Sequence, residues 1–298
     1  MKFPNKAIKN IRLSLRLRTV PNFLVNYSWN QQGITFLGKN KTKGRNSHGT
    51  ERTYTSVARA KVDSYGQIHT EESYEQIALQ KLAREKVVDE HGFLNEKSLE
   101  MQAELLHRRP THLQYSSPYN PTKFASVLMP LINSEHRGCL LLTQRSTYLR
   151  SHAGQMCFPG GRVEPSDGSH YYTALRETYE EIDLLPNFFT YINRIPPLLT
   201  KDLHTKIHTY VAFTLQNNLP SLGFGEVEKL YCIPLTSFLN PNYQKIAKFR
   251  NTNLEYVEFN IKDVPRIWGI TAVILNMYFR SLCPDSLIPT SNTLFAIC

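Results

Sequence analysis

The chain has 298 residues and is 41% hydrophobic, which is enough to bury a core in one large domain or in one domain with extensions. No stretch reaches the run of about 20 apolar residues that a membrane-spanning helix requires. The net charge of +10 is uneven, because residues 1–50 hold ten Lys or Arg and no acid, whereas the remaining 25 basic residues are matched by 25 acidic ones. A nucleic-acid binder carries its basic residues on a folded face, so we expect no nucleic-acid partner.

The basic excess lies in one terminal segment that has the composition of a targeting signal. Between Ile8 and Arg18, apolar and basic residues interleave without an acid. This composition is typical of an organelle transit peptide rather than of a secretory signal, so we expect import into the mitochondrial matrix. A basic tail without a targeting role is the alternative. The chain ends in Phe295-Ala296-Ile297-Cys298, which lacks a Ser-Lys-Leu type of address, so peroxisomes are the second choice.

Four regions follow from composition and periodicity. We assign residues 1–50 to a basic presequence or disordered segment and residues 51–118 to a linker with two helices. The helices are predicted because apolar residues recur at helical spacing around residues 77–87 and 99–106. Residues 119–285 form the main domain, and residues 286–298 form a C-terminal tail.

The main domain mixes strands and helices. Residues 124–132 and 138–143 are short apolar runs separated by a polar turn, which predicts two strands. Further strands are expected at 188–195, 206–215 and 227–233. A helix is expected at about 267–282, with Trp268 packed in the core at its start. The order of elements predicts an α+β fold in which a mixed sheet packs between helices.

A helix rich in glutamate is predicted at residues 172–184, after a tight glycine loop at Gly160-Gly161 and a polar turn. Glu177 precedes Glu180 by three residues and Glu181 by four, so a helix places all three side chains on roughly one face. Like charges in this arrangement repel each other. We therefore expect a cation beside them.

Two kinds of cation fit these carboxylates. Arg176 can neutralise one of them, and converging carboxylate oxygens also form the kind of site that Mg²⁺ or Mn²⁺ requires. The glycine pair lets the backbone approach an ion and a phosphate closely. An isolated Arg-Glu-x-x-Glu-Glu run is more often a solvated acidic helix face. The surrounding sequence must decide between the two.

That surrounding sequence resembles the Nudix box, the motif of the Nudix hydrolase family. Gly161 is followed by Asp167 and then by Arg176-Glu177-x-x-Glu180-Glu181. The box usually has Glu where Asp167 stands and Gly where Asp183 stands, and its gap before the arginine is seven residues rather than eight. The longer gap is shared by the coenzyme A diphosphatase branch. Asp183 is a mild change, because Asp tolerates the left-handed conformation that often ends a helix.

The segment before the box is more specific. It runs Leu141-Leu142-Thr143-Gln144-Arg145-Ser146, continues with Arg150 and Gly154, and ends in Phe158-Pro159-Gly160-Gly161. It is similar at every defined position to the signature of the coenzyme A diphosphatase branch, and the resemblance covers roughly residues 120–282. Arg145, Arg150 and His152 lie near the glycine loop in sequence. Guanidinium groups suit the diphosphate and 3′-phosphate of coenzyme A, although surface charges or strand-end ion pairs are the alternative.

The resemblance implies a Nudix fold and a Mg²⁺- or Mn²⁺-dependent hydrolase. Its substrate would be coenzyme A or acyl-coenzyme A, cleaved at the diphosphate to 3′,5′-ADP and a 4′-phosphopantetheine species. Arg176 would orient Glu177, and the general base would be a helix glutamate or Glu226. The implied metal ligands are Gly160, Glu177, Glu180 and Glu181.

The sequence leaves three alternative functions to compare with this one. The Nudix box fixes the chemistry and not the leaving groups, so NADH or ADP-ribose is an alternative substrate. A catalytically silent nucleotide-binding protein is disfavoured by the intact Glu177, Glu180 and Glu181. RNA binding through the basic terminus fails to explain the neutral remainder of the chain. Oligomeric state and acyl preference are not encoded in any pattern that we identify.

Overall fold

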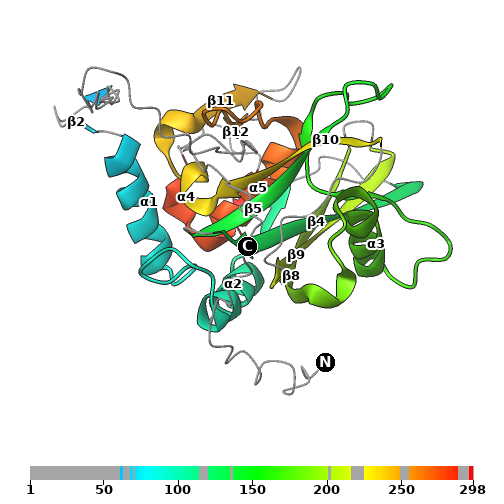
Figure 1. Cartoon of the computed structure of the whole chain (residues 1–298), viewed down its shortest axis with the longest axis horizontal. Helices are drawn as coiled ribbons and strands as arrows, with labels where there is room; N and C mark the ends of the chain where they lie inside the picture. Colours follow the sequence, from blue (N-terminus) through cyan, green and yellow to red (C-terminus); the bar gives the residue numbers. More distant parts are fainter. Residues whose placement is uncertain are drawn as a thin grey trace, which may run out of the picture.

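The computed structural model describes residues 61–62, 68–69, 71–113, 120–134, 137–200, 203–215, 225–248, 255–287 and 295–297. Figure 1 shows the whole chain coloured along the sequence. The basic segment on which the import prediction rests lies outside these residues. Across the described ranges, no helix has both the length and the hydropathy needed to cross a bilayer.

The helices agree with the periodicity of the sequence. The two helices expected ahead of the main domain and the glutamate-rich helix are all present, although the first begins six residues before the periodic run at 77–87. The α-helices are α1 (Glu71–Arg84), α2 (Glu96–Arg108), α3 (His170–Ile182), α4 (Leu235–Phe238) and α5 (Gly269–Leu282), and the 3-10 turns are Pro186–Phe188, Pro241–Tyr243 and Pro284–Ser286.

The expected strands are also present, with additional short ones. The strands are β1 (Lys61–Val62), β2 (Ile68–His69), β3 (Thr111–Leu113), β4 (Lys123–Asn133), β5 (Gly138–Arg145), β6 (Met156–Cys157), β7 (Gly160–Arg162), β8 (Phe189–Leu199), β9 (Thr205–Thr214), β10 (Val227–Pro234), β11 (Gln244–Lys248), β12 (Glu255–Phe259) and β13 (Phe295–Ile297).

A mixed sheet forms the centre of the domain. Its strand order is β10-β5-β4-β9-β8, with β6 paired to β5 and β7 paired to β4. The pair β4 and β9 is parallel, and the other pairs in this sheet are antiparallel. Strands β4 and β5 pair at Asn133 and Gly138, and the Ser134 amide donates to the Arg137 carbonyl at 2.9 Å, as the predicted turn requires. The short strands β6 and β7 lie at the end of the sheet where β5 ends. The glycine loop is formed by β7 and the residues that join it to β6.

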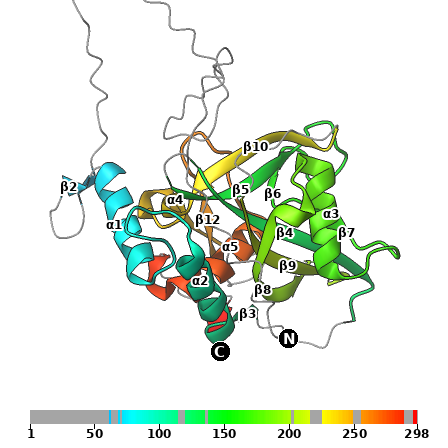
Figure 2. The ribbon, with the colours of Figure 1, turned by 60° about the horizontal axis from the view of Figure 1, so that its bottom comes forward.

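Helices cover both faces of this sheet, as the alternation along β4 requires. Leu128 packs with Ala174 and Leu175 of α3, whereas Met129 and Leu131 belong to the core shared with α5 and α2. Figure 2 shows α3 on one side of the sheet and α5 and α2 on the other. The α+β fold predicted from the order of elements is therefore confirmed, with the sheet between helical layers.

The prediction that Trp268 packs in the core is wrong. Helix α5 begins at Gly269, and Trp268 precedes it with an extended backbone at φ −145° and ψ 177°. The side chain therefore lies off the helical stripe and remains 38% exposed. Its ring instead lies 5.6 Å from the guanidinium of Arg266, a cation–π arrangement.

Candidate active site

Helix α3 is fixed at both ends by local chemistry. The Ser169 hydroxyl accepts a hydrogen bond from the Tyr172 amide at 3.1 Å, which satisfies one of the unpaired donors of the first turn. At the other end Asp183 adopts the left-handed conformation, with φ 55° and ψ 31°. The departure from glycine at this position is thus accommodated as the sequence predicted. Ala174 and Leu175 anchor the helix on the sheet, and Glu177 and Glu181 face the glycine loop.

The glycine pair of β7 is required by close contacts. A β-carbon at Gly160 would overlap the Ser126 carbonyl oxygen and the Val127 α-carbon of the neighbouring strand β4. A β-carbon at Gly161 would instead overlap the carboxylate of Glu177. The first glycine therefore lets two strands approach, and the second makes room for a carboxylate from α3.

Glu181 lies deeper than its neighbours. It is 7% exposed, and its Oε2 accepts a hydrogen bond from the Gly160 amide at 3.4 Å. Burial raises the pKa of this carboxyl to about 8, and the charges of Glu177 and Glu226 act in the same direction, against the Gly160 amide and Arg145. A buried carboxylate with other carboxylates nearby is a group that a bound cation would stabilise.

Arg176 connects the box acid to the helix. Its Nε lies 2.9 Å from Asp167 Oδ1 and its Nη2 3.1 Å from Asp167 Oδ2, a bidentate pair. The same guanidinium lies 3.2 Å from Glu177 Oε1 and 3.1 Å from Glu180 Oε2. Asp167 has a side chain that is 1% exposed and also accepts a hydrogen bond from Thr173 Oγ1 at 2.8 Å. Arg176 holds the pKa of Asp167 well below its usual range.

Sequence reasoning gave Asp167 no role beyond a motif position. The structure shows that it clamps the guanidinium that in turn contacts Glu177. The presence of an acid and an arginine on either side of the polar turn could have suggested an ion pair between them. Whether Asp167 reaches Arg176 depends, however, on how that turn folds. Arg176 therefore touches three carboxylates, where the sequence argument required only one.

The three helix glutamates are less alike than their shared helical face predicts. The Glu180 side chain is 54% exposed and turns to Arg176, whereas the side chain of Glu177 is 19% exposed. Within the described part of the chain, no three His, Cys, Asp or Glu side chains converge on one point. Mutual repulsion keeps carboxylates apart until a cation compensates them. Burial also raises the pKa of Glu177, against the opposing charge of Arg176.

These residues fit a divalent cation by the chemistry of their donors. Glu177 and Glu181 supply oxygens at the edge of the glycine loop, and Glu181 is desolvated with no ion pair among the described residues. Gly160 lies opposite Val127 in the β4–β7 ladder. The hydrogen bonds on either side run from the Leu128 amide to the Pro159 carbonyl and from the Val163 amide to the Phe124 carbonyl. In an antiparallel ladder this alternation turns the Gly160 amide and carbonyl away from β4. The Gly160 carbonyl is therefore available to a ligand.

Arg145 and Glu226 lie at the same end of the sheet. Arg145 ends β5, and its Nη2 lies 4.0 Å from Glu226 Oε2, too far for a hydrogen bond. The Arg145 Nε is buried and has no hydrogen-bond partner in the described structure. The Glu226 side chain is 64% exposed, and its carbonyl accepts from the Ser146 amide at 2.8 Å. The charge of Arg145 lowers the pKa of Glu181 and that of Glu226 raises it, so both act on the electrostatics of the α3 carboxylates.

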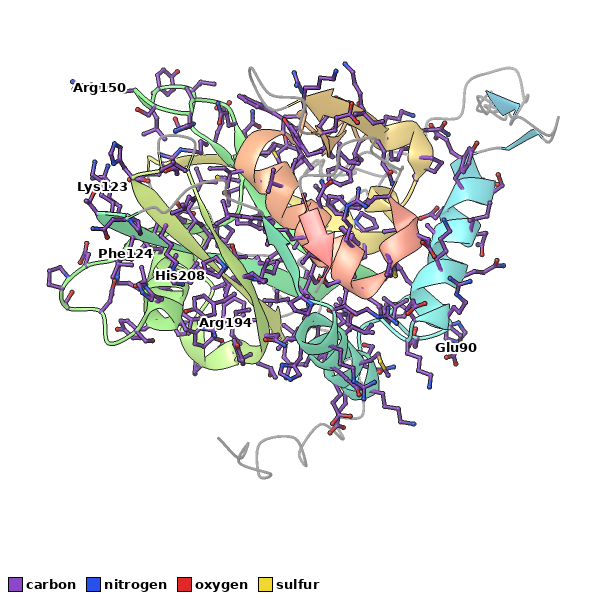
Figure 3. All side chains as sticks on the ribbon, turned by 180° about the vertical axis from the view of Figure 1, so that it is seen from behind. Glu90, Lys123, Phe124, Arg150, Arg194 and His208 are labelled. Atoms are coloured by element: carbon purple, nitrogen blue, oxygen red, sulfur yellow. The ribbon has the colours of Figure 1, made fainter. Side chains whose placement is uncertain are left out.

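Arg150 and His152 lie on the loop between β5 and β6. The base of this loop is closed by hydrogen bonds from the Arg145 amide to Gln155 at 2.9 Å and from the Gly154 amide to Arg145 at 3.0 Å. Arg150 is exposed and lies at the outer edge of the molecule (Figure 3). His152 is exposed with φ 58°, and its Nδ1 lies 3.1 Å from Gln155 Oε1. The structure thus brings Arg145 to the carboxylates and leaves Arg150 at the loop tip.

Comparison with known proteins agrees with this geometry. A family model described as NUDIX domain matches residues 122–251. A protein of Schizosaccharomyces pombe named as a probable Nudix hydrolase is 55% identical over 273 residues, covering 92% of this chain and 94% of that protein. Nudix hydrolase 3 of Caenorhabditis elegans is 28% identical over 195 residues, covering 58% of this chain and 79% of that protein.

Two further similarities were found. The uncharacterized Nudix hydrolase NudL of Salmonella paratyphi B is 36% identical over 154 residues, covering 51% of this chain and 78% of that protein. A crystal structure of a C. elegans Ap4A hydrolase binary complex matches with a TM-score of 0.32 and 20% identity, over 37% of this chain and 80% of that one.

The length and identity of the yeast match, together with the box built around Gly161, Arg176 and Glu177, leave one family. Its members cleave phosphoanhydride bonds in nucleoside diphosphate derivatives and generally use Mg²⁺ or Mn²⁺. The chain belongs to the Nudix hydrolase family.

Proposed function

We propose that this Nudix hydrolase cleaves the diphosphate of coenzyme A or its thioesters, releasing 3′,5′-ADP and a 4′-phosphopantetheine species. The observation that supports this substrate most directly is that the basic loop after β5 runs directly into the glycine pair. Arg145 ends β5, and the loop that follows it carries Arg150 and His152 and leads through β6 into the Gly160-Gly161 pair. A phosphate-rich ligand held by the loop would extend toward the α3 carboxylates.

The metal ligands in this proposal are Glu177, Glu180, Glu181 and the Gly160 carbonyl. Divalent ions, when bound, activate a water and screen the charge that develops on the diphosphate. Arg176 holds the Glu177 carboxylate at 3.2 Å and is itself held by Asp167, so the helix carboxylates are oriented before substrate arrives. When an ion binds, the Glu180 carboxylate would either leave Arg176 or contact both Arg176 and the ion. It can move because it is the most exposed of the three carboxylates.

The residues also account for proton transfer and substrate anchoring. A water oxygen attacks one phosphorus, the bridging P–O bond breaks, and the released proton passes to a helix glutamate or to Glu226. The unpartnered Nε of Arg145 and its weak pairing with Glu226 leave guanidinium donors for a phosphate oxygen. Arg145 would thus bind nearest the reacting diphosphate, and Arg150 would contact a more distant phosphate.

Steady-state turnover on coenzyme A, acetyl-coenzyme A, NADH and ADP-ribose tests the substrate. We expect the largest kcat/KM for the coenzyme A compounds in Mg²⁺, with 3′,5′-ADP as the product. The Glu177→Gln variant serves as a control for contaminating hydrolases. Preference for NADH or ADP-ribose would leave the Nudix chemistry intact and overturn the coenzyme A assignment.

Import into mitochondria is part of the proposal and rests on composition alone. Residues 1–50 carry ten basic residues and no acid. We expect a fusion of this segment to a fluorescent protein to enter mitochondria. A fusion that stays in the cytosol would contradict the targeting role, and one that enters peroxisomes would favour the second choice.

A further inference from the structure

A second pocket lies at the other end of the sheet, where helix α1 meets α4. Its cavity volume is about 50 Å³, and it is open to solvent on one side. Strand β10 runs from Val227, which pairs with Arg145, to Pro234, which lines this pocket. A strand of that length spans roughly 25 Å, so the pocket is separate from the α3 carboxylates.

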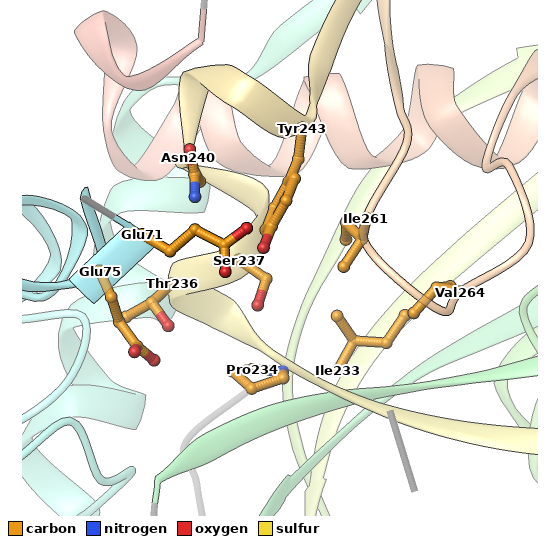
Figure 4. A pocket seen from close by; sticks show the side chains of 10 residues that line it. All are labelled: Glu71, Glu75, Ile233, Pro234, Thr236, Ser237, Asn240, Tyr243, Ile261 and Val264. Carbon is orange, nitrogen blue, oxygen red and sulfur yellow. The ribbon is translucent and has the colours of Figure 1, made fainter. Parts of the chain in front are cut away.

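The walls of this pocket differ in character. One side is polar and comes from α1 and α4, and Figure 4 shows the Glu71 carboxylate extending toward Ser237 and Tyr243. The opposite side is apolar and is formed by Ile233, Ile261 and Val264. Such a combination suits a ligand with one polar end and one aliphatic end.

The charge of the pocket is set by Glu71. Glu75 is paired with Arg137, which leaves it neutralised. Glu71 forms no ion pair with any of the residues that the structure describes. Burial raises the pKa of the Tyr243 phenol to about 12, and the negative charge of Glu71 acts in the same direction. Glu71 lies in the first turn of α1, where the helix dipole favours an acidic residue. The dipole does not explain why its side chain extends into the pocket.

Thr236 provides an independent indication of a ligand. The residue is 3% exposed and lines the pocket, and its Oγ1 is buried without a hydrogen-bond partner in the described structure. Leaving a buried hydroxyl unpaired is costly, so such groups usually have a partner. A donor in the pocket would satisfy Thr236 Oγ1.

We propose that this pocket binds a primary alkylammonium group. Such a group supplies three N–H donors and one positive charge, which match Glu71, Thr236 Oγ1 and the Tyr243 or Ser237 hydroxyl. The Tyr243 ring also offers a face to a cation, and the alkyl chain would lie against Ile261 and Val264. A divalent metal fits less well, because one unpaired carboxylate and neutral hydroxyls are a poor oxygen set for it.

Calorimetric titration of the full chain with n-butylamine tests this site. We expect n-butylamine to bind and n-butanol, which keeps the alkyl chain without the charge, not to bind. Glu71→Gln should weaken binding about tenfold or more, because a charged hydrogen-bond acceptor is lost. Glu72→Gln is the matched control, since Glu72 is exposed, lies in the same helical turn and does not line the pocket.

Thr236→Val separates a ligand role from a structural one. It replaces an unpartnered hydroxyl by a methyl group, so we expect an unchanged or higher Tm together with weaker n-butylamine binding. No binding to the wild type, equal affinities for the Glu71→Gln and Glu72→Gln variants, or displacement of the amine by Mg²⁺ would each overturn the assignment. If a blocked lysine binds more tightly than n-butylamine, the natural ligand is a lysine side chain of a protein. If n-butylamine binds more tightly, the natural ligand is a free amine.

Discussion

The Glu177 carboxylate occupies the space that a β-carbon on Gly161 would take. This contact explains why a glycine and a glutamate separated by the whole polar turn belong to one motif. It also differs in kind from the contact at Gly160, where the neighbour is the backbone of β4. The two glycines can therefore be tested against each other.

Gly161→Ala should reduce turnover with little loss of stability. The added methyl group meets the end of a flexible side chain, which can move, but the Glu177 carboxylate then leaves its position. A displacement of about 1 Å in a catalytic group can cost about a hundredfold in rate, so we expect kcat to fall about ten- to hundredfold. Gly160→Ala is the contrast, because its methyl group meets fixed backbone and should lower the stability by about 1–3 kcal/mol. Equal Tm losses for the two variants would contradict this division.

Glu181→Gln should remove most activity and leave the fold intact. Glutamine keeps the shape and the contact with the Gly160 amide, but it cannot supply a charged metal ligand. We expect kcat in saturating Mg²⁺ to fall by about two to three orders of magnitude, the size of effect seen when one electrostatic contact in a transition state is lost. Near wild-type kcat would refute the assignment of Glu181 as a ligand. A lower Tm with unchanged activity would favour a structural role.

Stability of the metal-free protein should depend on the ionisation of Glu181. Its pKa in the folded state is about 8, above the ordinary value of 4.5. Protonation of this carboxyl therefore contributes stability that is fully present below about pH 4.5 and is lost as the pH rises through about 8. We expect the Tm in EDTA to fall across this window, and Glu181→Gln to reduce the fall.

Added Mg²⁺ should reverse that trend. The ion binds the ionised carboxylate, so protons compete with it below about pH 8. We expect the difference between the Tm in Mg²⁺ and the Tm in EDTA to grow from pH 6 to pH 8.5. A difference that stays constant over this range would show that Glu181 does not bind the ion, whatever its pKa.

Arg150→Ala should raise KM for coenzyme A more than for dephospho-coenzyme A, which lacks the 3′-phosphate. A guanidinium-phosphate contact contributes about 1.5–3 kcal/mol, so we expect about a tenfold or greater difference between the two substrates. Arg150 is exposed at the tip of its loop, and the variant should keep the wild-type Tm. Lys97→Ala, which removes an exposed cation from α2, is the matched control. Equal KM increases for both substrates would make Arg150 a diphosphate or scaffold residue.

The sequence determined the elements whose formation depends on neighbouring residues. The helix that carries Glu177 and Glu181, the left-handed end at Asp183, and the turn between β4 and β5 follow from spacing and turn chemistry, which act over a few residues. Trp268 shows the limit of this reasoning. Periodicity placed it on a helical stripe, but the helix begins one residue later and the ring is exposed.

Tertiary structure alone decided how the site residues differ from one another. Glu180 and Glu181 are adjacent in sequence, yet one faces Arg176 and solvent while the other is buried with a pKa near 8. The cause is the packing of β7 against α3, where the Gly160 amide contacts Glu181, so water is removed from Glu181 and not from Glu180. The clamp between Asp167 and Arg176 and the pocket beneath α1 arise in the same way. Burial and ion pairing depend on which segments meet in space, and no local pattern in the sequence encodes that.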